Sequence, residues 1–275
     1  MGTHHLQLDL RQISRHSVNN AKLPMTAVAR YFEANVISSV NILGYNKPAE
    51  VFYLCRLNLE KIYIISIIDV FVDLEGRDCL NHHMTGTSVV QLRDNDLKVS
   101  NATLATLESS VPALTVYGVS YNQYDADIGK IINRLKAQKT TLSSLALYNN
   151  ELKGTLPPSV GELRELFVLD VEHNQLHGRI PPAITLLTKL QRLKLSGNSF
   201  QGSLPQNLGN LALLSSLRFR RNCLNGSWPN TFHQLSRLID LDASDNHIED
   251  TIESIVSLTN LKTLDLHNNY FRGTV

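Results

Sequence analysis

The sequence predicts an α/β repeat fold: a curved, right-handed solenoid with a parallel sheet on its concave side. Three observations predict it. A motif of leucines and one asparagine recurs through residues 142–275, its interval is nearly constant, and glycine–proline turns separate the copies. The motif is LxxLxLxxNxL, and its asparagines are 24, 24, 24, 24 and 23 residues apart by subtraction of their numbers. Self-similarity at such a period is typical of a stacked repeat array.

Each copy of the motif contains a short strand with one apolar face. The first copy is Leu142, Leu145, Leu147, Asn150 and Leu152. Side chains in a strand point alternately to its two faces, so the leucines of LxL turn inward together. One coil cannot bury that apolar edge alone, and stacked coils therefore share a core and form a parallel sheet. On this motif the chain is identified as a leucine-rich repeat protein.

An asparagine ends the strand in each copy, where the chain bends toward the core. Its amide can donate to and accept from backbone groups that the bend leaves buried, so we expect a structural role. Two upstream motifs have longer intervals of 27 and 28 residues, which contain helical spacing at 102–109 and 128–137. The predicted ladder is Asn95, Asn122, Asn150, Asn174, Asn198, Asn222, Asn246 and Asn269.

A second signature, GxΦP with Φ apolar, lies between copies of the motif. It occurs at 154–157, 178–181, 202–205 and 226–229, and is lost at 250–253. Glycine permits the turn, and proline fixes φ and removes a donor, so the convex side should change from helices to extended or 3₁₀ segments near residue 150. The signature resembles the plant-type repeats of receptor-like kinases, receptor-like proteins and polygalacturonase inhibitors.

The predicted organisation has three parts. Residues 87–275 form the repeat array, which is open at the C-terminus because the last coil stops within its turn, as in a fragment. At intervals of 25 residues before Asn95 there are two apolar motifs without the asparagine. Their positions are Ile62, Ile65, Ile67 and Val72, and Ile37, Val40 and Ile42. We interpret residues 35–86 as degenerate repeats or a cap, and residues 1–34 as a polar arm or N-terminal cap.

Composition excludes several classes of partner. A net charge of +1 gives no global field toward nucleic acid. The longest apolar run, 62–72, is too short to span a membrane. The first residues lack the apolar core of a secretory signal, which favours the cytoplasm, whereas a fragment of a longer protein would fit the cell surface. Glycosylation triplets at Asn101 and Asn225 favour the second alternative weakly. The sequence indicates no oligomeric state.

Catalytic and metal-binding signatures are also missing. The sequence has no glycine-rich phosphate loop, GxSxG elbow or kinase signature, so we expect neither an enzyme nor a cofactor. The nearest approach to a metal site is Cys79, His82 and His83, with Cys55 upstream; adjacent histidines project apart, and we predict no metal. Cys223 is predicted to be a buried, unreactive thiol.

The candidate binding site is the concave face. Aligning the copies on the asparagine places a basic stripe, two coils wide, between acidic coils. Cross-strand opposite charges could simply neutralise one another, at about 0.2–1 kcal/mol per pair. Alternatively, the cations exceed what the acids require, and arginines bind a partner's carboxylate or phosphate. The predicted ligand-binding residues are Tyr121, Tyr148, Asp170, Glu172, Arg192, Lys194, Arg218, Arg220, Arg221, Asp242 and Asp245.

The predicted function is protein or peptide binding by a non-enzymatic module, with charge reversal of Arg218 and Arg220 expected to weaken binding without unfolding the chain. Three alternatives remain. The first is an intracellular interaction scaffold. The second, implied by the resemblance, is the ligand-recognition part of a cell-surface receptor-like protein or kinase, acting upstream of signalling. The third is an inhibitor of a secreted enzyme.

Overall fold

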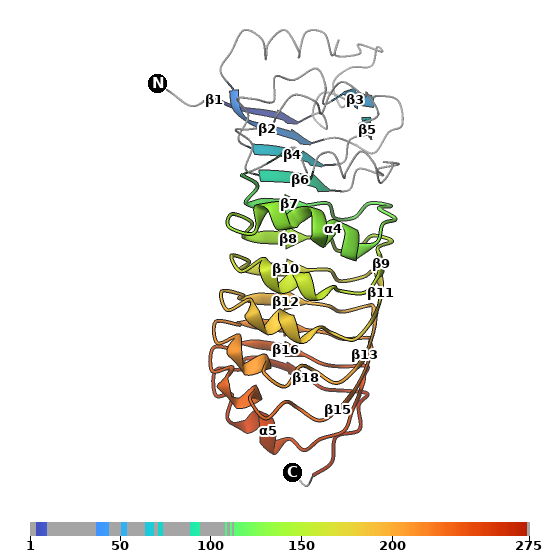
Figure 1. Cartoon of the computed structure of the whole chain (residues 1–275), viewed down its shortest axis with the longest axis vertical. Coiled ribbons are helices and arrows are strands. Elements are labelled where there is room, and N and C mark those ends of the chain that lie inside the picture. Colours follow the sequence, from blue (N-terminus) through green and yellow to red (C-terminus); the bar gives the residue numbers. More distant parts are fainter. Residues whose placement is uncertain are drawn as a thin grey trace. The chain divides into compact units, whose positions relative to one another are not determined.

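The structure, a computed structural model, describes six short strands before residue 94, then Glu108, Val111 and residues 113–273. The chain forms two compact units, residues 1–124 and 125–275. The predicted boundaries of the arm, the degenerate segment and the array stay predictions. Parallel strands are present in both units (Figure 1).

The first unit contains a parallel ladder of strands. Its strands are β1 (His4–Asp9), β2 (Ile37–Leu43), β4 (Ile64–Ile68), β6 (Val89–Arg93) and β7 (Val116–Gly118), with β3 (Val51–Tyr53) paired to β5 (Phe71–Asp73). The register sets Val40 beside Ile65, Ile65 beside Val90, and Val90 beside Tyr117. Residues at the same position of the repeat motif are therefore paired on successive strands of this unit.

The second unit is built on a first sheet of six parallel strands. They are β8 (Ser144–Ala146), β10 (Val168–Asp170), β12 (Arg192–Lys194), β14 (Ser216–Arg218), β16 (Asp240–Asp242) and β18 (Thr263–Asp265). The central leucine of each strand is in register with the next. From Leu145 to Leu241 these leucines are at most 1% exposed, whereas Leu264 in the last strand is 47% exposed. The parallel solenoid sheet predicted from the motif is thus confirmed.

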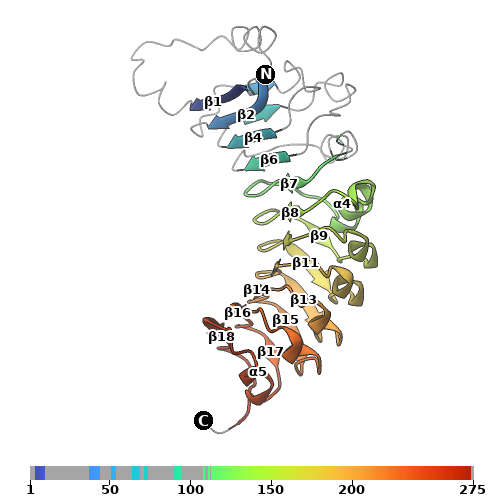
Figure 2. The same ribbon diagram turned by 90° about the vertical axis from the view of Figure 1, so that its left-hand side faces the viewer.

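A second parallel sheet follows the asparagines. Its strands are β9 (Lys153–Gly154), β11 (Gln175–Gly178), β13 (Ser199–Gly202), β15 (Cys223–Gly226) and β17 (His247–Ile248). Figure 2 shows the first sheet along one side of this unit and the helical turns along the other. These turns are α4 (Ile128–Leu135), η3 (Lys136–Gln138), η4 (Pro158–Glu162), η5 (Pro182–Leu186), η6 (Leu208–Asn210), η7 (Phe232–Gln234) and α5 (Glu253–Val256).

The change from helix to 3₁₀ turns near residue 150 is present in the structure. Helix α4 buries Ile128, Ile131, Ile132 and Leu135 at helical spacing, and the Asp127 carboxylate caps its first turn. The four coils with GxΦP have 3₁₀ turns instead, and the coil that lost both glycine and proline forms α5. The helix predicted at 102–109 lies outside the described residues except for Glu108.

Glycine is required in GxΦP by backbone geometry. Gly154 has φ +89° and Gly178 has φ +79°, a region that side chains with a Cβ avoid. A Cβ on Gly154 would lie 2.5 Å from the Asp127 carboxylate, and one on Gly178 would lie 2.7 Å from the Thr155 methyl group. The signature therefore also allows close packing between successive coils.

The ladder asparagines join neighbouring coils through backbone hydrogen bonds. Asn222 donates from Nδ2 to the carbonyls of Leu195 (3.1 Å) and Phe219 (2.9 Å), and its Oδ1 accepts from the Phe200 N–H (2.9 Å). The same three contacts recur at the equivalent residues Asn174, Asn198, Asn246 and Asn269. Asn122 in the first unit donates to the Leu92 carbonyl at 2.8 Å. Asn95 lies outside the described residues.

Candidate functional site

The candidate site is the outward surface of the first sheet in the second unit, the side predicted to be concave. We call it the strand face, defined as the outward side chains within residues 143–149, 167–173, 191–197, 215–221, 239–245 and 262–268. Because inward and outward residues alternate, the leucines leave these positions free of the core. Backbone register aligns them in rows across the strands. One row is Val168, Arg192, Ser216, Asp240 and Thr263, and the next is Asp170, Lys194, Arg218, Asp242 and Asp265.

Ion pairs connect neighbouring strands of this face. Lys194 Nζ lies 3.2 Å from the Asp170 carboxylate, whose side chain is only 8% exposed. Arg218 Nε donates to Asp240 Oδ2 at 2.6 Å, and Ser216 Oγ donates to the same oxygen at 2.8 Å. Arg218 therefore pairs with a diagonal neighbour, although Asp242 is its partner in register.

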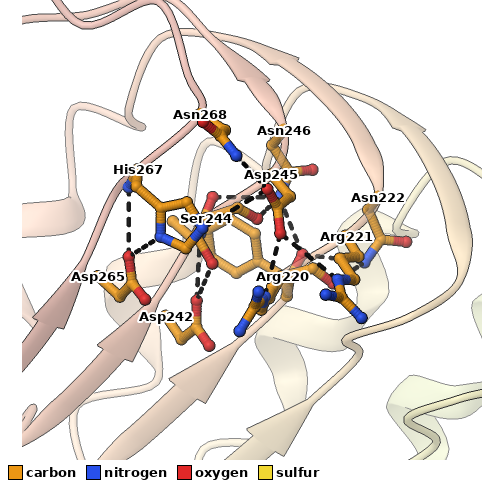
Figure 3. Close-up of polar contacts among 12 residues, drawn as sticks. Arg220, Arg221, Asn222, Asp242, Ser244, Asp245, Asn246, Asp265, His267 and Asn268 are labelled. Carbon is orange, nitrogen blue, oxygen red and sulfur yellow. Dashed lines mark hydrogen bonds and ion pairs between the residues drawn. The ribbon is translucent and has the colours of Figure 1, made fainter.

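A larger polar cluster surrounds Asp245 (Figure 3). Its carboxylate accepts from Asn268 Nδ2 at 2.7 Å and from Arg220 Nε at 3.1 Å. Arg221 Nε lies 3.5 Å away, and His267 Nε2 lies 3.6 Å away. One carboxylate thus holds two arginines and links the coils that contain β14, β16 and β18.

Two further aspartates stabilise the chain where it leaves the strands. Asp242 Oδ1 accepts from Ser244 Oγ at 2.6 Å and from the Ser244 N–H at 3.2 Å. Asp265 Oδ1 accepts in the same way from His267 Nδ1, at 2.5 Å, and from the His267 N–H, at 3.2 Å. Both carboxylates are therefore used within their own coils.

The residue before each ladder asparagine has a left-handed backbone. In the second unit Asn149, His173, Arg221, Asp245 and Asn268 have φ between 52° and 55°. The equivalent residue of the β12 coil is a glycine at 197, with φ +66°. Such conformations are costly for residues with a Cβ and are held by the surrounding hydrogen bonds. They fix the position of the Arg221 and Asp245 side chains.

The protonation of the face follows from these contacts. The hydrogen bond from Asn268, aided by the one from Arg220, lowers the pKa of Asp245. The hydrogen bond to Asp240 raises the pKa of Arg218. Burial raises the pKa of Glu172, and the nearby Asp170 charge acts in the same direction.

These shifts predict a dependence of stability on pH. The folded state binds the Asp245 proton more weakly than the unfolded state, so Asp245 stabilises the fold above its ordinary pKa of 3.8. That contribution is lost as pH falls through the lowered folded value. In chemical denaturation from about pH 7 to pH 3, the difference in unfolding free energy between parent and Asp245→Asn should shrink toward low pH. A difference independent of pH would contradict the assignment.

Glu172 acts in the opposite direction in the same experiment. Its folded pKa is raised above 4.5, so its contribution to stability declines as pH rises from that value through the folded pKa. Glu172→Gln removes this decline, and its stability should rise relative to the parent as the solution becomes neutral. If the difference in unfolding free energy between Glu172→Gln and the parent stays the same at all pH values, the pKa of the Glu172 carboxyl is not raised.

The structure brings most of the predicted site residues together, but not all of them. Tyr148 is half-buried on the strand face, whereas Tyr121 belongs to the first unit. Lys194, Arg218, Arg220 and Arg221 are paired with carboxylates. Within the described residues, the surplus positive charge suggested by the sequence is therefore reduced to Arg192, which is exposed and has no carboxylate partner.

Apolar residues of the strand face were not among the predicted site residues. Phe167 is 38% exposed and Ile239 is 42% exposed, and both immediately precede a first-sheet strand. Val168 is half-buried in β10. Aligning the residue that follows the first leucine of the motif would have found Phe167 and Ile239, because the motif leaves that position unconstrained.

The cysteines and modification triplets have the following positions. Cys55, Cys79, His82 and His83 lie outside the described residues; among those described, no three His, Cys, Asp or Glu side chains are grouped for a metal. The prediction for Cys223 is wrong, because its side chain is exposed. It begins β15 between two inward residues of the second sheet, so strand alternation turns it to solvent.

Asn225 is exposed in the same strand, and Asn101 lies outside the described residues. None of the helices described in the structure is long and apolar enough to cross a membrane.

The comparisons agree with this geometry. Residues 236–273 match the family model for Leucine Rich repeats (2 copies), and residues 189–211 match that for Leucine Rich Repeat. Among curated proteins, no sequence matches this one. Together with the repeating coils and the asparagine ladder, the matches define a leucine-rich repeat solenoid.

Several solved plant structures are similar. The plant peptide hormone receptor RGFR1, in complex with RGF2, is 23% identical with a TM-score of 0.68; the match covers 90% of this chain and 42% of that one. The Arabidopsis receptor kinase HAESA, in complex with the peptide hormone IDA and the co-receptor SERK1, is 19% identical with a TM-score of 0.63; the match covers 90% of this chain and 44% of that one. Pollen Receptor Kinase 3 is 28% identical with a TM-score of 0.53; the match covers 59% of this chain and 77% of that one.

This chain is a leucine-rich repeat protein with plant-type repeats. It spans less than half the length of RGFR1 and HAESA.

Proposed function

We propose that the chain is a non-enzymatic binding module whose strand face engages a protein or peptide segment. The observation that supports it is the combination of exposed apolar side chains, such as Phe167 and Ile239, with rows of oriented charges on one sheet. Backbone pairing and the asparagine ladder hold this surface before a ligand arrives. A preformed surface loses little conformational freedom on binding, which favours affinity.

The similar structures support the same class of function. RGFR1 and HAESA were solved with peptides bound, although identities of 23% and 19% establish a shared fold only. The proposal for this chain therefore rests on its own strand face. Arginines whose orientation is fixed by an acidic neighbour keep donors available to a ligand, because Arg218 and Arg220 each use Nε for the internal bond.

Two finer roles follow from the module, and one experiment separates them. The recognition part of a receptor-like protein would reach the cell surface, whereas an interaction scaffold would stay inside the cell. Expressing the complete gene product with a tag and recording its compartment decides between them. The inhibitor alternative requires inhibition of a secreted enzyme such as a pectin-cleaving one, and an inactive protein in that assay would remove it.

A test of the strand face starts from peptides selected with the full chain. The immobilised chain is used to select binders from a random dodecapeptide library, and their affinity is measured for the parent and for Arg218→Gln/Arg220→Gln. Neutralisation is preferable to charge reversal, since a glutamate at position 218 would face Asp240 directly. We expect binding to weaken about tenfold or more, because charge-assisted hydrogen bonds are lost.

The matched control is Arg164→Gln/Arg237→Gln, which removes two exposed arginines near the helical turns. This control should bind like the parent. Equal affinity of the strand-face variant and the parent, with both proteins folded by circular dichroism, would contradict the proposed face.

A further inference from the structure

We propose that Arg192, with Phe167 and Val168, forms a subsite for an acidic side chain that lies next to an apolar residue in the bound peptide. This inference rests on the proposed function and specifies the ligand's chemistry. Two observations support it: the carboxylates around Arg192 are paired with other cations, and apolar residues lie on the adjacent strand.

The carboxylates that the strand register places around Arg192 are paired with other cations. In register, Arg192 lies between Val168 and Ser216, neither of which carries a charge. On one diagonal, Asp170 is paired with Lys194 at 3.2 Å. On the other side, Ser216 donates its hydroxyl to Asp240, which also accepts from Arg218.

The turn before β10 offers no free acid either. Glu165 is held by Lys189 at 2.6 Å in the neighbouring coil. Within the described residues, the Arg192 guanidinium therefore has no carboxylate partner. Five N–H donors in a planar fork match a carboxylate in two-point contact, so a ligand acid would find its most favourable position here.

Two apolar residues lie on the adjacent strand and at its start, beside Arg192 in the register. The Arg192 N–H donates to the Phe167 carbonyl at 3.0 Å, which fixes Phe167 on the adjacent coil. Phe167 is 38% exposed, and Val168 follows it in β10. Neighbouring strands are about 4.8 Å apart, and an extended peptide advances about 3.3 Å per residue. An acid bound to Arg192 and an apolar side chain on Phe167 should therefore be within two residues of each other.

The test uses the peptides selected from the random dodecapeptide library on the full chain. We expect enriched sequences to carry Asp or Glu within two positions of a large apolar residue. Synthetic copies are made with an amidated C-terminus, so that side-chain carboxylates are tested without a terminal one. Replacing the acid by Asn or Gln should weaken binding to the parent about tenfold, as expected for a charge-assisted pair.

A double-mutant cycle assigns that acid to Arg192. In Arg192→Gln, the acidic peptide and its neutral copy should bind equally, since the interaction is already absent. The control Arg164→Gln removes an exposed cation from the turn preceding β10 and should retain the tenfold difference. Circular dichroism and thermal unfolding verify that both variants keep the parent fold.

The outcomes separate the two proposals. Enriched peptides without an acid, or an acid effect that persists in Arg192→Gln, would overturn this subsite while the binding function stands. If no peptide is enriched on the parent chain, the proposed function and the subsite both fail.

Discussion

Replacing Asn222 by alanine should lower the free energy of unfolding of the second unit by about 3 kcal/mol or more. The side chain is 6% exposed and makes four backbone hydrogen bonds, two to Leu195 and Phe200 of the preceding coil and two to Phe219 and Arg220 of its own coil. Its removal leaves one N–H and three carbonyls without this partner at a buried or half-buried position. Each unsatisfied group costs about 1–3 kcal/mol, and partial relaxation keeps the total near the lower bound.

The measurement is urea denaturation followed by tryptophan fluorescence. Trp228 is the single tryptophan of the sequence and lies in the second unit, so its emission reports on the part that Asn222 stabilises. Asn225→Ala is the matched control, because Asn225 is an exposed asparagine three residues away and should change stability by less than about 0.5 kcal/mol. Equal effects of the two substitutions would refute the structural role of the ladder.

Replacing Trp228 by alanine should lower the free energy of unfolding at least as much as Asn222→Ala, by about 3–5 kcal/mol. The indole is 4% exposed and fills the Φ position of its GxΦP turn. Its ring lies 4.5 Å from Phe232, 5.8 Å from Phe271 and 6.3 Å from Phe219, measured between centroids. Alanine leaves a cavity among these rings, of which Phe219 and Phe232 lie in the same repeat as Trp228 and Phe271 lies in the last repeat. Denaturation followed by circular dichroism measures the loss.

Trp228→Phe is the informative comparison. The indole Nε1–H is buried and has no hydrogen-bond acceptor among the described residues. Phenylalanine keeps an aromatic ring among its neighbours, although a smaller one, and it removes this unsatisfied donor. The lost packing and the removed donor therefore offset each other. We expect a change of less than about 1.5 kcal/mol. If phenylalanine is as costly as alanine, the indole N–H has a partner and the packing account is wrong.

The arrangement of the stacked coils could be predicted from the sequence because its causes are local and repeat in every copy of the motif. Strand alternation places Leu169, Leu193 and Leu217 inward, and parallel register then follows from stacking equal coils. The backbone demands of GxΦP are equally local, since φ at Gly154 and Gly178 is positive in the structure. The loss of this signature at 250–253 coincides with a short α-helix.

The details of the strand face could not be predicted in this way. Charge rows alone match Arg218 with Asp242, but Asp242 accepts from Ser244, and Arg218 reaches Asp240 instead. Nor does a motif alignment show that Trp228 stacks on Phe271, 43 residues away by subtraction. Such contacts depend on side-chain rotamers and on competition between donors, which repeat spacing does not encode.

Binding of peptide at the strand face can be mapped with a crosslinking footprint. A selected peptide carrying a photoreactive amino acid is bound to the full chain and irradiated, and the attachment sites are mapped by mass spectrometry. If the strand face binds the peptide, crosslinks should lie within residues 167–173, 191–197 and 215–221. Crosslinks concentrated on the helical turns or on the second sheet, with the strand face unlabelled, would contradict it.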